Sequence, residues 1–204
     1  MGKKWIYLIA YVIWLAISRS GIPDPYGEIL LDFNSLVVKM IFVITGTILF
    51  HKDLINNFKI LNLNRIFKLI FLTFTTIIVS LAVINFLLSG KIILFDFHYP
   101  KDQINVPLLL DTLLIAPMFE ELLYRYSLIY IGANKLLNIA TSCLSVVLFT
   151  FGHLSNANGQ IYLLIPFLII GIVLTVNYLF RRNIWESILP HISYNLLVVV
   201  LSMI

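Results

Sequence analysis

Two acids and one base stand together in an apolar part of the chain. Residues 118–127 read MFEELLYRYS and place Glu120, Glu121 and Arg125 within six consecutive positions. An ionisable side chain inside a membrane-spanning helix costs about 2.5–3.5 kcal/mol, so such groups usually face the protein interior and mark functional sites. Glu121 and Arg125 share one helix face, with the acid on the N-terminal side, which is the favourable order for an ion pair. Because Glu120 lies on an adjacent face, the spacing predicts that one glutamate is neutralised and the other is not.

Two histidines and an asparagine occur in later apolar runs. His191 and Asn195 are four residues apart, so they project from one helix face. At a rise of about 1.5 Å per residue, Glu120, His153 and His191 lie roughly 18, 20 and 13 Å from the same membrane side. Each residue also has an ordinary structural interpretation, such as an interface histidine at His153 or an interhelical hydrogen bond at Asn195. Their common depth predicts a single buried site.

Such a set of side chains is suited to amide hydrolysis. Glu120 can serve as the general base for a water that His153 helps to hold or polarise. His191 and Asn195 can donate hydrogen bonds to the oxyanion that develops on the substrate. The neighbouring ion pair would support the helix and set the local charge.

The sequence gives less support to a zinc protease, a serine hydrolase, a binding protein or a transporter. There is no H-E-x-x-H and no G-x-S-x-G, which argues against a thermolysin-like zinc helix and a serine-nucleophile elbow. We therefore expect no cofactor, although histidines and glutamates from separate helices could still bind zinc. A non-catalytic protein that binds a peptide or a membrane partner stays open as well. Proton-coupled transport is disfavoured because the chain shows no repeated halves.

The composition predicts the elements that must position these residues. The 204 residues are 60% hydrophobic and 12% charged, with a mean hydropathy of +0.98, which indicates an all-α, polytopic membrane bundle rather than a soluble domain. The net charge of +4 does not indicate nucleic-acid binding, because the basic residues form no patch interleaved with aromatic residues. A window of about 20 residues predicts seven spans, with six as the alternative. The predicted spans are 5–20, 29–50, 66–89, 107–132, 137–154, 160–180 and 184–204.

We expect a single transmembrane domain over 1–204, with accessory spans in 1–105 and a catalytic core in 106–204 formed by the last four spans. The lysines and arginines gather on one side under seven spans, which predicts a cytoplasmic N-terminus. Residues 51–68 alternate apolar and polar side chains at helical spacing, so we expect an amphipathic helix along the membrane interface. Pro117 should loosen the helix before Glu120 and free a carbonyl near residue 113.

Three motifs then resemble one known family. Residues 120–125 read EELLYR and resemble its E-E-x-x-x-R motif, residues 149–153 read FTFGH and resemble F-x-x-x-H, and residues 191–195 read HISYN and resemble H-x-x-x-N. Together and in this order they resemble the CPBP family, the CAAX proteases and bacteriocin-processing enzymes also called Abi proteins. Tyr126 departs from the family pattern, in which glycine often follows the arginine.

The resemblance implies an intramembrane endopeptidase of the glutamate type. It places water activation on Glu120 and His153 and oxyanion stabilisation on His191 and Asn195. It also implies a bacterial plasma-membrane protein whose partners are the lipid bilayer and a peptide or membrane-protein substrate. A bacteriocin or its receptor is one such partner, with self-immunity or peptide maturation as the process served.

Overall fold

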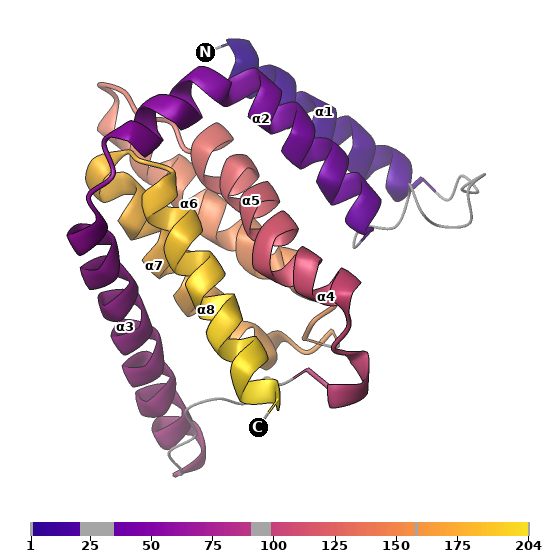
Figure 1. Cartoon of the computed structure of the whole chain (residues 1–204), viewed down its shortest axis with the longest axis vertical. Helices are drawn as coiled ribbons and strands as arrows, with labels where there is room; N and C mark the ends of the chain where they lie inside the picture. Colours follow the sequence, from indigo (N-terminus) through magenta and orange to yellow (C-terminus); the bar gives the residue numbers. More distant parts are fainter. Residues whose placement is uncertain (1, 21–34, 91–98, 158, 204) are drawn as a thin grey trace.

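Every regular element that the structure describes is a helix. The computed structural model describes residues 2–20, 35–90, 99–157 and 159–203, and within these ranges the predicted all-α class is confirmed (Figure 1). The elements are α1 (Gly2–Ser18), α2 (Leu36–Lys59), α3 (Leu63–Ser89), η1 (Lys101–Gln103), α4 (Val106–Leu110), η2 (Asp111–Ile115), α5 (Ala116–Glu120), η3 (Glu121–Ser127), α6 (Lys135–Gly152), η4 (Ile161–Leu164), α7 (Ile165–Arg181) and α8 (Trp185–Met203).

The helices form a multi-pass membrane protein. The contiguous segments α4, η2, α5 and η3 make one central helix, so the described residues contain seven long helical segments that match the seven predicted spans. By length and composition, four of them can cross a membrane. They are Leu63–Leu87, Lys135–Gly152, Ile161–Arg181 and Trp185–Met203. Large apolar side chains on the outside of α3, such as Phe71 with 72% of its surface exposed, fit a helix that faces lipid.

The expectation of one amphipathic helix over 51–68 is wrong, because the segment is divided between two helices. Residues 51–59 continue α2, and the chain then breaks and restarts as α3. The restart lies at Asn62, whose side chain accepts a hydrogen bond from the backbone N–H of Arg65 and so caps the new helix. The second helix therefore extends past residue 50, whereas residues 29–34 of the predicted span lie outside the described residues.

The central helix is irregular just before Glu120. The segment η2 is a π-helix, in which the Ala116 N–H bonds to the Asp111 carbonyl five residues earlier. In that register the next donor would serve the Thr112 carbonyl, but the next residue is Pro117, which has no N–H. The freed carbonyl instead accepts a hydrogen bond of 2.8 Å from Nδ2 of Asn195 in α8. The predicted loosening at the proline is confirmed, with the freed carbonyl one residue earlier than expected.

The first two helices pack directly against the central helix. Gly46 of α2 permits this contact, because a Cβ atom there would lie 3.1 Å from both Leu122 and Tyr7. Tyr126, the residue that departs from the motif, donates a hydrogen bond of 2.6 Å to Asp53 of α2. The division into accessory spans and catalytic core stays a prediction, but these contacts show that the first spans brace the helix that carries Glu120.

The two ends of the bundle differ in charge. The end that holds the start of α1 also holds the end of α2, the starts of α3, α6 and α8 and the end of α7 (Figure 1). The opposite end includes the Lys39–Asp111 ion pair of 2.6 Å. The basic residues at the first end, called the basic end below, are Lys3, Lys4, Lys52, Lys59, Arg65, Lys68, Lys135, Arg181 and Arg182.

Candidate active site

Glu120 lies between two histidines from other helices. It is the last residue of α5, and its carboxylate Oε1 is 3.8 Å from Nε2 of His153 while its Oε2 is 3.7 Å from Nε2 of His191. About 15% of the glutamate side chain is exposed. Both separations exceed a direct hydrogen bond, and they allow one small polar atom to contact the carboxylate and an imidazole together. The structure thus brings together three residues that the sequence places 33 and 38 positions apart.

His153 is held where α6 ends. Its Nδ1 lies 2.8 Å from the carbonyl of Phe149, and since a carbonyl only accepts, Nδ1 carries the hydrogen. The ring stacks on Phe167, with centroids 4.3 Å apart and an interplanar angle of 23°. With Nδ1 occupied and the ring plane fixed, the neutral imidazole presents the lone pair of Nε2 toward Glu120.

His191 is held by Glu121 rather than by backbone. Its Nδ1 lies 2.9 Å from Oε1 of Glu121, and only about 5% of its side chain is exposed. An ionised carboxylate accepts hydrogen bonds only, so Nδ1 donates and Nε2 is directed at Glu120. The two glutamates, adjacent in sequence, therefore contact opposite edges of one imidazole.

Glu121 and Arg125 form the ion pair that their spacing indicates. Both side chains are fully buried, and Nη1 of Arg125 lies 3.3 Å from Oε1 of Glu121. The guanidinium also donates to the Gly171 carbonyl at 3.3 Å and lies over the Phe149 ring, 4.2 Å from its centroid. The pair thus connects the central helix to α6 and α7, and it orients the carboxylate that holds His191.

Ser187 belongs to this network and was missed in the sequence. Its hydroxyl donates to Oε2 of Glu121 and also lies 3.0 Å from the carbonyl of Leu174 in α7. The signal that could have found it is its position four residues before His191, on the face that also carries Asn195. A serine in an apolar helix is too common a residue for that spacing alone to indicate a role.

Asn195 makes a hydrogen bond between helices that its expected role did not include. Its Nδ2 bonds to the Thr112 carbonyl that Pro117 leaves free, so one of its two amide hydrogens is used between helices. The second amide hydrogen and the side-chain oxygen remain. The structure thus brings α8 against the π-helical turn before Glu120, and it leaves Asn195 with one donor for a substrate.

The side-chain types around Glu120 are ones that zinc accepts. Within the described ranges, however, no group of three or more histidine, cysteine, aspartate or glutamate side chains is arranged to hold a metal ion.

A helical membrane bundle with a carboxylate between one buried and one partly buried imidazole is suited to hydrolytic chemistry inside the membrane. The chain belongs to the Rce1-like family of type II CAAX prenyl endopeptidases, the CPBP proteins, whose family model matches residues 102–197. That match includes all six residues of the predicted site. The protein is thus a member of a family of membrane-embedded proteases.

Two relatives carry no assigned activity in their names. The UPF0177 protein YxdF of Lactococcus lactis subsp. lactis (strain IL1403) is 30% identical over 168 residues, which cover 79% of this chain and 89% of that protein. An uncharacterized protein of Mycoplasma capricolum subsp. capricolum is 35% identical over 91 residues, or 44% of this chain and 26% of that protein. No solved structure matches the chain.

Proposed function

We propose that the protein is an intramembrane endopeptidase of the glutamate type, with Glu120 as the general base. The observation that carries the proposal is the position of the Glu120 carboxylate, 3.8 Å from Nε2 of His153 and 3.7 Å from Nε2 of His191. A water that donates one hydrogen to Glu120 can donate the other to His153, whose ring is oriented for it by the Phe149 carbonyl. A positioned general base of this kind contributes about 10²–10⁴-fold to the rate.

We assign stabilisation of the oxyanion to His191 and Asn195. The hydrogen bonds that these side chains already make limit which donors they can offer to a substrate. Because Nδ1 of His191 donates to Glu121, His191 can donate from Nε2 only as the imidazolium. Asn195 can offer the amide hydrogen that is not bonded to Thr112. Removal of one such donor commonly costs about 10²–10³-fold in kcat.

The first experiment compares Glu120→Gln with wild type. Both proteins, in lipid nanodiscs, are incubated with a library of fluorogenic membrane-anchored peptides, and cleavage is followed by fluorescence and mass spectrometry. Glu120→Gln should lose at least about 100-fold in kcat. The matched control is Glu186→Gln, which removes a buried carboxylate that pairs with Arg65 at the basic end and does not touch Glu120. Cleavage by a folded Glu120→Gln protein at the wild-type rate would refute the assignment.

A chelator arm separates the glutamate mechanism from the zinc alternative. We propose that no cofactor takes part, so activity should persist after treatment with a membrane-permeant zinc chelator and dialysis. Loss of cleavage that added zinc restores would instead make the side chains around Glu120 metal ligands.

A non-catalytic function has one observation in its favour. Both candidate oxyanion donors already make internal hydrogen bonds, His191 to Glu121 and Asn195 to Thr112, as expected of a structural network. If the protein protects its host against a bacteriocin by binding the peptide or its receptor, protection should survive Glu120→Gln. If it acts in self-immunity or peptide maturation by cleavage, the same substitution should abolish the phenotype.

We further propose a bacterial plasma-membrane location with the basic end in the cytoplasm. Nine lysines and arginines lie at that end, and cytoplasmic loops carry an excess of these residues. Reporter fusions at the N-terminus and at residue 101 test the orientation. A reporter that works only in the cytoplasm should be active at the N-terminus, and a reporter that works only after export should be active at residue 101.

A further inference from the structure

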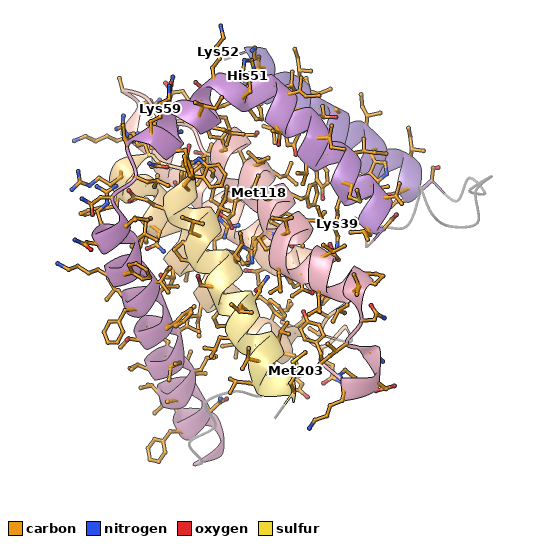
Figure 2. All side chains as sticks on the ribbon, viewed as in Figure 1. Lys39, His51, Lys52, Lys59, Met118 and Met203 are labelled. Carbon is orange, nitrogen blue, oxygen red and sulfur yellow. The ribbon has the colours of Figure 1, made fainter. Side chains whose placement is uncertain are left out.

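A lateral groove lies beside the central helix, on the face turned away from Glu120. It has a volume of about 360 Å³ and is formed by the last turns of α2, by Met118 of α5 and by Trp185 at the start of α8. Figure 2 shows Met118 on α5, below the turns of α2 that carry His51 and Lys59. Met118 and Glu120 are two residues apart, or about 200° around a helix. An occupant of the groove therefore lies outside the predicted active site.

The groove has an apolar wall and a basic rim. Ile55 and Phe58, both at least half exposed, line it together with Met118. Trp185 closes one side, and its indole N–H donates to the Leu54 carbonyl at 2.9 Å, so the ring is fixed in place. Lys59 and His51 stand at the end that lies with the other basic residues of the bundle. This combination suits a ligand with a long apolar chain and an anionic head.

The part of the chain that the structure describes offers no acidic partner to the basic side chains of the rim. Among the described residues, neither Lys59 nor His51 forms an ion pair with a carboxylate. Lys59 is the last residue of α2 and exposed, so its ammonium can reach a headgroup at the membrane surface. His51 uses Nδ1 on the Ile48 carbonyl, which leaves Nε2 for an outside partner.

We propose that the groove binds one anionic phospholipid, with an acyl chain along Phe58 and Met118 and the phosphate at Lys59. A protein in a bilayer is surrounded by lipid, and basic pockets between helices at the cytoplasmic side select anionic headgroups. A zwitterionic lipid such as phosphatidylcholine would fill the apolar part equally well, but the cationic choline beside its phosphate offsets the attraction of the Lys59 ammonium. The preference for anionic lipid is therefore the property that defines the site.

Trp185 provides a direct readout because it lines the groove. In a Trp5→Phe, Trp14→Phe background, Trp185 is the single tryptophan of the chain. The protein is reconstituted in phosphatidylcholine vesicles, and phosphatidylglycerol or phosphatidylcholine with brominated acyl chains is titrated in as the quencher. We expect brominated phosphatidylglycerol to quench Trp185 at about one fifth of the concentration that brominated phosphatidylcholine requires. A five-fold ratio is roughly the effect of one basic residue on the binding of an anionic lipid.

Variants distinguish lipid binding in the groove from a general attraction of anionic lipid to the basic end. Lys59→Gln should bring the ratio of the two lipids close to one, and Lys59→Arg should keep the preference. The control Lys52→Gln removes an exposed lysine of the same helix that does not line the groove, so it should keep most of the preference. Equal quenching by the two lipids, or equal losses in Lys52→Gln and Lys59→Gln, would overturn the proposal.

Discussion

The buried pair of Glu121 and Arg125 allows a double-mutant cycle that tests the electrostatic design of the site. Glu121→Gln keeps one of the two oxygens that accept from Ser187 and His191, replaces the other with an amide nitrogen, and leaves the Arg125 charge buried without its partner. Arg125→Met leaves the Glu121 charge buried without its partner and also removes the hydrogen bond to the Gly171 carbonyl. Both side chains are 0% exposed, so neither charge can turn to water.

The expected magnitude follows from that burial. Removal of one member of a fully buried ion pair costs about 3–5 kcal/mol, because the remaining charge stays desolvated. For a chain of this size that is roughly 6–20 °C in Tm, on the scale of soluble proteins. The double variant Glu121→Gln with Arg125→Met removes both charges, so it should be less destabilised than the sum of the single variants by about 1–3 kcal/mol.

The assay is thermal unfolding in lipid nanodiscs, followed by the fraction of protein that still elutes as a single species after heating. The control pair is Lys39→Met with Asp111→Asn, whose ion pair is partly exposed and should show weaker coupling. If the single variants at 121 and 125 melt like wild type, or if their effects simply add, the two charges do not depend on each other and the reasoning is refuted.

Three further predictions concern residues around the site. Ser187→Ala should lower kcat by about 10-fold with little change in KM in peptide cleavage assays, because the hydrogen bond that orients the Glu121 carboxylate beside His191 is lost. Ser187→Thr keeps the hydroxyl, so an equal loss in that variant would contradict the prediction. Asn195→Asp should destabilise the bundle by about 1–3 kcal/mol, since a carboxylate oxygen would face the Thr112 carbonyl, and an unchanged Tm would rule this out. Gly46→Val should cost about 1–3 kcal/mol by crowding Tyr7, whereas Gly2→Val, with nothing within 4 Å of the added Cβ, should leave Tm unchanged.

Features that depend on neighbours along the chain could be predicted from the sequence. Seven apolar runs predict seven helical segments because a helix satisfies its own backbone groups in lipid. The pairing of Glu121 with Arg125 follows from a spacing of four residues on one helix. The irregularity before Glu120 follows from Pro117, which lacks a backbone donor. Errors occurred where apolar and polar residues alternate, as at the break between α2 and α3, since periodicity there does not show that Asn62 starts a new helix.

Contacts between helices were decided by the tertiary structure alone. A common depth predicted that Glu120, His153 and His191 could meet, but depth does not specify how each helix is turned about its axis. That rotation directs His191 to both glutamates and places the Ser187 hydroxyl behind Glu121. It also pairs the Asn195 amide with a backbone carbonyl. Helices that are apolar on most sides contain no local signal for their rotation, because lipid and protein neighbours accept the same side chains.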